Sequence, residues 1–427
     1  MDDRPSSFYH PQEVRDFNGQ MRAKNAAGLD IIDLSEQSVV AAARRDTGLD
    51  CFGDACFEPG LRMVLRSAEE EAHLNPFGRK FMRDMSVAWL KNRLWANACF
   101  EAHPEILQRK ISAPIVIVGL PRSGTTRLQR MLSADPRLQF MRVWEGLNPA
   151  PRLGLPDLGR AARYAEVEET LGARMRLNPG ATSAHPQHPD WAEEELMLLN
   201  HSFCGLFPVA FLDTPSYHKW ICESDRSDAY RYMASLMKLL SWSRGDAESK
   251  RWIMKTPQHM LDLRALIEVF PDAKLVFALR DPIKTVGSAL SLAWNYSLLY
   301  SDLPRRASIR DAWLFFCEKL ARTSMEVRAT LPASQQLNVF YEDMNRDWRG
   351  VMKQIYEFAD VELTPAAEQA LAGWLADSGQ KHRYGAHRYA LKDYGVTAEE
   401  IDARMQFYRE RYAIPYEKKS AWARSST

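Results

Sequence analysis

Residues 114–126 read PIVIVGLPRSGTT, a β-branched run that leads directly into a loop with two glycines. The four consecutive branched residues from Ile115 to Val118 are typical of a parallel strand that is buried on both faces. After the loop, Leu128 and Leu132 share one side of a helix that ends before Pro136. This order of strand, glycine loop and helix predicts a phosphate-binding loop, in which successive backbone N–H groups and the positive helix N-terminus face one anion.

The spacing of Gly119 and Gly124 matches the start of the nucleotide triphosphatase loop GxxxxGK[ST], but Thr125 stands where that loop carries its lysine. Because that lysine binds the β- and γ-phosphates of a nucleotide, its absence disfavours a nucleoside triphosphate as the ligand. Arg122 brings a cation into the loop instead, and its guanidinium fork suits a single terminal anion.

The string GLPRSGTT resembles the 5′-phosphosulfate loop of the PAPS-dependent sulfotransferases, which reads PKSGTT or PRSGTT; PAPS is 3′-phosphoadenosine 5′-phosphosulfate. Short segments in the order found in bacterial-type members of that family extend the likeness over nearly the whole chain: NRL at 92–94, HPEI at 103–106, WE at 144–145, MKTPQH at 254–259 and HRYALKDYG at 387–395. The resemblance implies that the 5′ end of PAPS is bound by Pro121, Arg122, Ser123, Gly124, Thr125 and Thr126.

Further apolar runs extend the expected sheet. KLVFAL at 274–279 and LNVF at 337–340 predict two more strands, and RWIM at 251–254 is strand-like. Since helical patterns separate these runs, we expect an α/β fold with a P-loop-like parallel sheet flanked by helices. The segment between Pro149 and Pro189, rich in proline, glycine and arginine, is expected to make excursions over the sheet.

The first part of the chain has a different pattern. Phe81, Met85 and Trp89 recur every four residues, which places an apolar stripe on one side of a helix. We therefore expect a helical region over residues 1–110, packed on a sulfotransferase domain over residues 111–427.

A second anion-binding pattern follows the run KLVFAL. Arg280 stands at the carboxyl end of that strand, and Ser288 lies eight residues further on, in the next helix. In the sulfotransferase family an arginine and a serine at this spacing hold the 3′-phosphate of PAPS; an ion pair of Arg280 with Asp281 is the structural alternative. Tyr341 opens the segment YEDM, which is similar to one whose tyrosine contacts the adenine in cytosolic sulfotransferases.

Sulfonate transfer resembles phosphoryl transfer, in which alignment and neutralisation of the leaving phosphate supply most of the catalysis. Arg122 is expected to face that phosphate, and in the family the lysine of the KTP segment, here Lys255, lies near it. A general base must take the proton of the acceptor. Glu145 is the first choice, because tyrosylprotein sulfotransferases place a catalytic glutamate in the comparable stretch. His185 is the alternative: its segment HPQHPDWAEEE is similar to the family's His-Pro followed by a glutamate pair, and imidazole titrates near neutral pH.

Two other functions stay open at this point. A nucleotide-dependent kinase of related fold would share the loop, although Thr125 in the lysine position disfavours it. A non-catalytic protein that binds an adenine nucleotide, or 3′-phosphoadenosine 5′-phosphate (PAP), the product left by PAPS, would keep the loop and lose the base.

The acceptor is also open, among hydroxyl or amine groups of small molecules, lipids, glycans and peptides, and so is the oligomeric state. Five aromatic residues near the HPQHPD segment either line an apolar acceptor pocket or belong to the core: Phe203, Phe207, Phe211, Tyr217 and Trp220.

Composition excludes several classes of protein. The chain has 427 residues with 56 Lys and Arg against 55 Asp and Glu, a formal charge of +1 that demands no nucleic-acid partner. Six cysteines without a CxxC pair favour a reduced, cytoplasmic protein without a metal site. The first residues show no secretory signal, and polar residues interrupt the apolar stretch Leu196–Leu212. We therefore expect one buried helix there and no membrane span.

Overall fold

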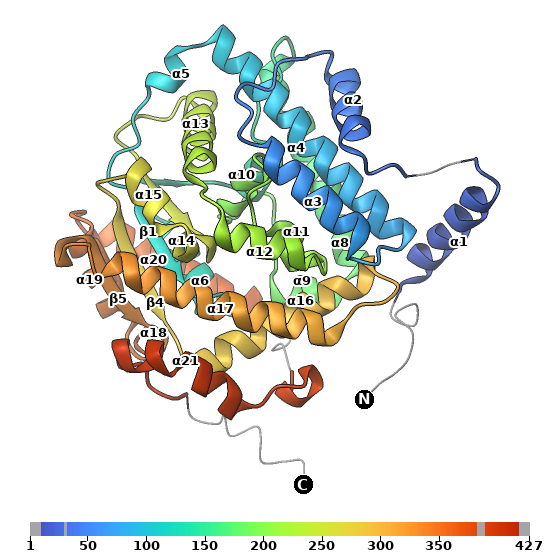
Figure 1. Cartoon of the computed structure of the whole chain (residues 1–427). Helices are drawn as coiled ribbons and strands as arrows, with labels where there is room; N and C mark the ends of the chain where they lie inside the picture. Colours follow the sequence, from blue (N-terminus) through green and yellow to red (C-terminus); the bar gives the residue numbers. More distant parts are fainter. Residues whose placement is uncertain (1–9, 30–31, 382–388, 418–427) are drawn as a thin grey trace.

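Five parallel strands form one sheet in the computed structural model, which describes residues 10–29, 32–381 and 389–417 (Figure 1). Their order across the sheet is β2-β3-β1-β4-β5. Every neighbouring pair is parallel, which confirms the predicted α/β fold. The strands are β1 (Ile115–Gly119), β2 (Leu138–Phe140), β3 (Arg251–Lys255), β4 (Lys274–Leu279) and β5 (Gln336–Phe340).

The central strand β1 is buried on both faces, as its sequence predicts. Val116 and Val118 belong to the larger hydrophobic cluster, whereas Ile115 and Ile117 belong to the smaller cluster on the opposite face. This division follows from the alternation of side chains along a strand. The edge strand β2 is not predicted by the sequence pattern, because its three residues are too few to show a period.

The larger cluster joins the sheet to the N-terminal helices. Leu61 and Leu90 share it with Val116 and Val118 of β1. Figure 1 shows α2, α3 and α4 side by side, at the end of the molecule away from β5. A domain boundary between residues 110 and 111 stays a prediction. The N-terminal helices are α1 (Gln12–Ala26), α2 (Glu36–Thr47), α3 (Glu58–Glu70), α4 (Pro76–Ala102) and α5 (Glu105–Gln108).

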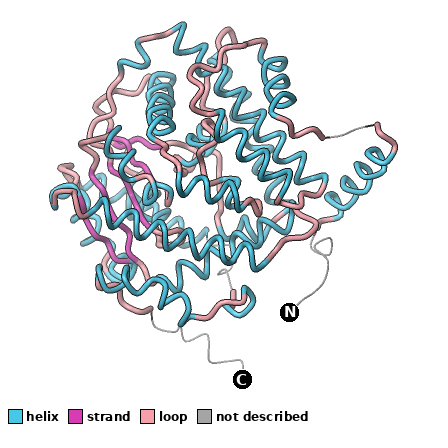
Figure 2. Tube along the Cα trace, in the orientation of Figure 1, coloured by secondary structure: helices cyan, strands magenta, loops and turns pink. Residues whose placement is uncertain are grey.

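Helices surround the strands on both faces (Figure 2). Leu128 of α6, Met352 of α19 and Leu371 of α20 cover the face of Ile115 and Ile117. From β1 to β3 the helices are α6 (Thr125–Leu132), α7 (Val143–Leu147), η2 (Pro156–Gly159), α8 (Arg160–Leu177), α9 (Pro179–Ala184), α10 (Leu196–Asn200), α11 (Phe207–Phe211), α12 (Pro215–Glu223) and α13 (Ser227–Arg244). After β3 they are α14 (Gln258–Leu261), α15 (Leu263–Val269), α16 (Pro282–Tyr300), α17 (Arg306–Arg328), η3 (Ala333–Gln335), α18 (Tyr341–Arg346), α19 (Trp348–Phe358), α20 (Pro365–Lys381), η4 (Leu391–Tyr394) and α21 (Ala398–Tyr412).

The apolar stretch Leu196–Leu212 is not the one buried helix that its composition predicts. It forms two five-residue helices, α10 and α11, separated by a turn in which Phe203 has a φ of 53°. A Cβ at Gly205 would lie 2.0 Å from the side-chain oxygen of Asn200, so the chain doubles back too tightly for one helix. Pro208 then lies in the first turn of α11, where proline fits a helix. No helix in the described part of the chain is long and apolar enough to cross a membrane.

The segment between Pro149 and Pro189 is more regular than the expected excursions. Its centre is α8, an 18-residue helix that packs against α7 and α9. Alanine, glutamate and arginine residues, which favour helices, make up most of α8, while the prolines and all glycines except Gly172 lie before it or after it. The segment therefore folds mainly as a helix against α7 and α9.

Candidate active site

The loop between β1 and α6 has a backbone suited to anion binding. Arg122 has a φ of 69° and Gly124 a φ of 93°, so the chain curls back before α6 begins at Thr125. A Cβ at Gly124 would lie 2.7 Å from Cδ2 of Tyr341, so glycine is needed at this position. The left-handed backbone of Arg122, a non-glycine residue, is the kind of strain that functional sites retain.

Ser123 places an unpaired hydroxyl in this loop. Its Oγ is buried and has no hydrogen-bond partner in the described parts of the chain. A buried polar atom without a partner is costly, and a bound oxyanion would satisfy it. The N-terminus of α6, an eight-residue helix, adds N–H groups and partial positive charge at the same place. The loop thus fits the terminal phosphate group that its sequence predicts.

Two arginines and a serine from different segments meet beside the loop. Arg122 Nε donates to Ser288 Oγ at 3.1 Å, and Arg280 Nη1 donates to the carbonyl oxygen of Arg122 at 2.9 Å. The Arg280 guanidinium lies 3.9 Å from the centre of the Tyr341 ring. The structure therefore brings together four residues that the sequence assigns to one ligand from three separate motifs.

The cluster carries more positive charge than negative charge. Burial lowers the pKa of Arg122, and the neighbouring Arg280 lowers it further. Two guanidinium groups at such close range repel each other, so an anion beside them is stabilised. In the structure Glu417 supplies a carboxylate to Arg280, with 2.6 Å between Nε and Oε1. A phosphate that binds Arg280 must compete with Glu417.

Lys255, at the end of β3, connects the loop to a carboxylate. Its Nζ donates to Thr126 Oγ1 at 3.3 Å and to Glu194 Oε1 at 2.5 Å. Glu194 also accepts a hydrogen bond from the Thr256 hydroxyl at 3.4 Å. A buried lysine beside an anion-binding loop can neutralise charge that develops on a leaving phosphate.

In the described residue ranges, no three His, Cys, Asp or Glu side chains gather as potential metal ligands.

His185 is paired with a buried carboxylate. Its Nε2 lies 3.0 Å from Oε2 of Glu193 and 3.2 Å from Oε1, and Gln187 donates to the same carboxylate at 2.9 Å. Burial alone would raise the pKa of Glu193, but the charge and hydrogen bond of His185, with the charges of Lys255 and Arg130, hold it well below its usual range. The ionised Glu193 can accept a hydrogen bond from Nε2–H of His185, which orients the ring and leaves Nδ1 as its second polar atom.

Glu145 does not join this group. Arg244 Nε donates to its Oε1 at 2.7 Å, and the backbone N–H of Arg142 donates to its Oε2 at 2.9 Å as part of the cap of α7. The Arg142 side chain is a third donor, at 3.2 Å. A carboxylate that three donors engage and that is only 1% exposed is poorly placed to take a proton from an acceptor. The geometry thus argues against the role of general base that the sequence predicts for Glu145.

Glu193 and Glu194 are the residues that the sequence analysis misses, since it selects only His185 from their segment. Residues 192–199 read AEEELMLL, and the three acidic residues directly before an apolar run indicate buried carboxylates. Charged residues are buried in such a context only when they are paired, so these glutamates require cationic or hydrogen-bonding partners.

The predicted family segment HRYALKDYG is described only in part, because His387 and Arg388 lie outside the described residues. The hydroxyl of Tyr389 donates to the carbonyl oxygen of Lys284 at 3.0 Å. A Cβ at Gly287 would lie 2.8 Å from Cε2 of Tyr389. The segment therefore packs against the first turns of α16, next to Ser288.

A large cavity of about 570 Å³ opens beside the His185 and Glu193 pair. His185 and Gln187 belong to its wall, and the remainder of the wall is mainly apolar. A volume of this size is typical of sites that enclose a small-molecule ligand. The apolar lining comes from α4, α8, α10, α11 and α16 and includes Phe81, Trp89, Val167, Leu171, Met197, Phe207, Phe211 and Tyr300.

The five aromatic residues considered from the sequence divide between this cavity and the core. Phe207 and Phe211 line the cavity, and their rings stack with 4.1 Å between centres. Tyr217 belongs to the core, where its hydroxyl donates to the carbonyl oxygens of Phe203 at 3.0 Å and Gly205 at 2.9 Å. Of the five aromatic residues, Phe207 and Phe211 therefore form part of the apolar wall of the cavity.

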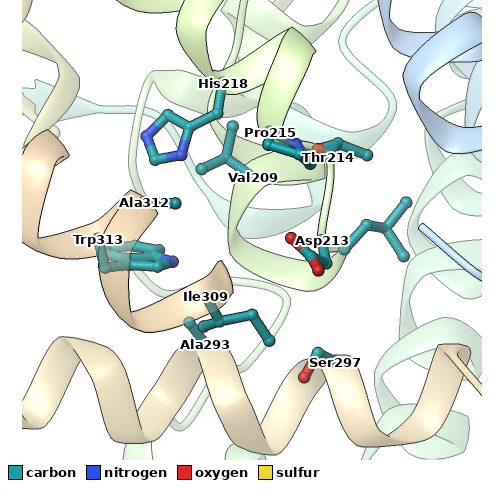
Figure 3. A pocket seen from close by; sticks show the side chains of 11 residues that line it. Val209, Asp213, Thr214, Pro215, His218, Ala293, Ser297, Ile309, Ala312 and Trp313 are labelled. Atoms are coloured by element: carbon teal, nitrogen blue, oxygen red, sulfur yellow. The ribbon is translucent and has the colours of Figure 1, made fainter. Parts of the chain in front are cut away.

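A second and much smaller cavity lies between α11, α12, α16 and α17, with His218 and Trp313 on its wall (Figure 3). It has room for about one water molecule. Burial lowers the pKa of His218 to about 4, so the imidazole is uncharged at neutral pH. Its Nε2 has no hydrogen-bond partner within the described ranges. This space can hold a structural water but no substrate.

Comparison with known proteins places these features in one family. Residues 114–365 match the model of the sulfotransferase family. The omega-hydroxy-beta-dihydromenaquinone-9 sulfotransferase Stf3 of Mycobacterium tuberculosis is 23% identical over 309 residues, which cover 67% of this chain and 71% of the relative. The crystal structure of sulfotransferase STF1 from Mycobacterium tuberculosis has a TM-score of 0.75 at 28% identity and covers 87% of this chain and 98% of that one. Sulfotransferase STF9 from Mycobacterium avium has a TM-score of 0.80 at 26% identity, with 91% and 99% covered.

The matched segment holds more than half of the chain and contains the loop, Lys255, Arg280 and Tyr341. The chain therefore belongs to the sulfotransferase family. It is an enzyme that transfers a sulfonate group to an acceptor, as the resemblance of its loop implies.

Proposed function

We propose that the sulfonate donor is PAPS. The loop of residues 121–126 binds its 5′ end, Arg280 and Ser288 bind its 3′-phosphate, and Tyr341 contacts its adenine. The observation that carries this proposal is the pair of hydrogen bonds that link Arg122 to Ser288 and Arg280, because they set a second cationic group directly beside the loop. A donor with phosphates at both its 5′ and 3′ positions suits two adjoining anion sites. A nucleoside triphosphate has no 3′-phosphate to bind Arg280 and Ser288.

Lys255 and Arg122 are proposed to neutralise the charge that develops on the leaving 5′-phosphate. Both side chains are held in place before the reaction, Lys255 by Thr126 and Glu194 and Arg122 by Ser288. Preorganised cations of this kind lower the barrier because little reorganisation is needed during the reaction. The acceptor oxygen forms a bond to sulfur while the bond from sulfur to the 5′-phosphate oxygen breaks, and PAP leaves.

His185 is proposed to take the proton of the acceptor through Nδ1, and Glu193 to hold the imidazole through Nε2. The support is the placement of His185 on the wall of the large cavity, with Glu193 buried behind it. This arrangement of a base and the group that orients it recurs in enzymes that activate hydroxyl groups. Glu194 is the competing candidate, because it contacts Lys255 directly.

The acceptor is proposed to be a hydroxyl compound with a large apolar part. The cavity supports this choice, since His185 lies on its wall and the wall is mainly apolar. The curated relative is named for an omega-hydroxy dihydromenaquinone, a lipid with a hydroxyl group. The cytoplasm stays the predicted compartment, supported by six cysteines that form no disulfide.

The test is a transfer reaction with PAPS and a panel of hydroxylated lipids, followed by mass spectrometry. The expected result is the mass gain of one sulfonate group on an apolar hydroxyl compound, release of PAP and no need for magnesium. Phosphate transfer from ATP that requires magnesium would move the kinase to first place. Tight PAP binding without turnover on any acceptor would favour a non-catalytic binding protein.

A further inference from the structure

Arg174 of α8 places a cation beside two aromatic residues in the wall of the large cavity. Its guanidinium carbon lies 5.2 Å from the ring centre of Phe207 and 5.9 Å from that of Phe211. All three side chains line the cavity. Stacking on two aromatic faces holds the guanidinium in position and leaves its N–H edge available for another contact.

The guanidinium of Arg174 has no ion pair and no hydrogen bond to any residue in the ranges 10–29, 32–381 and 389–417. The other cations around the cavity differ in this respect. Lys80 is paired with Asp84, and the nearby Arg152 is paired with Glu166 at 2.7 Å. Glu169 also lines the cavity, but it is exposed, lies five residues before Arg174 on α8 and forms no ion pair with it. Arg174 is thus a cation of the cavity wall without a protein anion.

An acceptor that fills this cavity displaces the water that solvates Arg174. If the acceptor offers only hydrocarbon there, the cation loses hydration without compensation, which is costly. If it offers a carboxylate, the planar anion matches the guanidinium fork and forms charge-assisted hydrogen bonds. A phosphate monoester suits the site less well, because its charge of nearly two exceeds that of a single arginine.

We propose that the acceptor carries a carboxylate in addition to its hydroxyl group, and that Arg174 selects for it. This inference rests on the proposed function, in that the cavity is taken as the acceptor site. The substrate class is therefore a hydroxylated amphiphile with an acidic group, such as a hydroxy fatty acid, rather than a neutral lipid alcohol.

The test compares two ligands that differ only in this group, 12-hydroxydodecanoate and 12-hydroxydodecanamide, by calorimetry on the full-length protein. The wild-type protein is expected to bind the carboxylate about tenfold more tightly, since a hydrogen bond between charged partners is stronger than one to a neutral group. Arg174→Gln should remove the preference, and Arg174→Lys should keep part of it. Arg176→Gln is the matched control: Arg176 lies on the same helix but is exposed, 4.0 Å from Glu13.

Equal affinity for both ligands in the wild type would overturn the proposal, and so would a preference that survives Arg174→Gln or one that disappears in Arg176→Gln. Failure of either ligand to bind would also overturn it. The measurement uses neither PAPS nor turnover, so it is independent of the transfer test. PAP binding by each variant, measured in parallel, reports whether the fold is intact.

Discussion

The Nε of Arg122 lies 3.1 Å from the Oγ of Ser288, although 166 residues separate them in the chain. The contact joins the glycine loop after β1 to the helix after β4. Because β1 and β4 are neighbours in the sheet, their carboxyl ends open at the same edge, where ligands of parallel sheets bind. The two anion sites are therefore parts of one surface, and a change in either should affect the other.

Arg122→Ala should reduce transfer by a factor on the order of 100 or more, because it removes a preorganised cation from the leaving phosphate. Arg122→Lys should retain part of the activity, since related loops carry lysine at this position. The measurement is the steady-state rate of PAP release with saturating acceptor. Arg127→Ala is a useful control in the adjoining helix α6, because the Arg127 guanidinium donates to Asn345 Oδ1. Turnover near the wild-type value in Arg122→Ala would contradict the assigned role.

His185→Asn should lower kcat strongly and leave the affinity for PAP nearly unchanged, the pattern expected when only proton removal is lost. Glu145→Gln should instead lower the free energy of unfolding, since Glu145 is buried between Arg142 and Arg244. Both variants are compared by single-turnover kinetics and by urea denaturation.

Glu194→Gln completes the comparison. If kcat falls more in this variant than in His185→Asn, Glu194 is the base. If Glu145→Gln loses kcat while its stability is unchanged, the prediction made from the sequence is correct and the geometric argument against it fails.

The sequence predicts the strand, turn and helix of residues 115–132 well because the relevant residues are adjacent in the chain, and PAPS binding by the loop stays a prediction. The β-branched run, the glycines and Arg122 lie within 13 consecutive residues, and a strand, a tight turn and a helix follow from local rules. Arg280 and Tyr341 can be predicted for a related reason, since each directly follows a strand, and the ends of parallel strands converge.

The base cannot be chosen from the sequence, because the choice depends on partners that are distant in the chain. Arg244, which engages the carboxylate of Glu145, is 99 residues away. The cavity is hidden in the same way, since α4, α8 and α16 build its wall from three remote segments. Packing of these elements decides which side chains face the ligand, and no local pattern encodes it.

Glu417→Gln should tighten the binding of PAP while the affinity for 5′-AMP stays the same, because Glu417 competes with the 3′-phosphate for Arg280. In the wild-type protein PAP should bind roughly ten- to a hundredfold more tightly than 5′-AMP, as one charge-assisted contact of about 1.5 to 3 kcal/mol implies. Calorimetry with both nucleotides, in EDTA, measures the two affinities.

Arg280→Ala should remove most of this preference. Because Arg280 also donates to the Arg122 carbonyl oxygen, a modest loss of 5′-AMP affinity is expected in that variant. Glu417→Gln leaves this contact in place, so a change in PAP affinity in that variant reports the binding of the 3′-phosphate alone. Equal wild-type affinity for PAP and 5′-AMP would overturn the assignment of Arg280 and Ser288.

Because of the buried Glu195, the free energy of unfolding of the enzyme should decrease as the pH rises. Its fully buried carboxylate accepts a hydrogen bond from the backbone N–H of Lys255 at 2.6 Å. Burial raises the pKa of Glu195 to about 8; the charge of Glu194 adds to this effect, and the N–H and charge of Lys255 oppose it. At neutral pH the folded protein therefore retains a proton that the unfolded chain releases. Stability should fall between the ordinary glutamate pKa of about 4.3 and a pH of about 8, by up to about 1.4 kcal/mol per pH unit.

Glu195→Gln should remove this loss, because an amide oxygen still accepts from Lys255 and carries no titratable proton. Urea denaturation of both proteins at about pH 5 and about pH 8 measures the effect as a difference in unfolding free energy. Burial lowers the pKa of the neighbouring His259 to about 3, and this residue is present in both proteins, so it cancels from the comparison. The variant should gain stability relative to the wild type as the pH rises. Parallel stability curves for the two proteins would mean that Glu195 is ionised in the folded state and that Lys255 and its surroundings compensate for its burial.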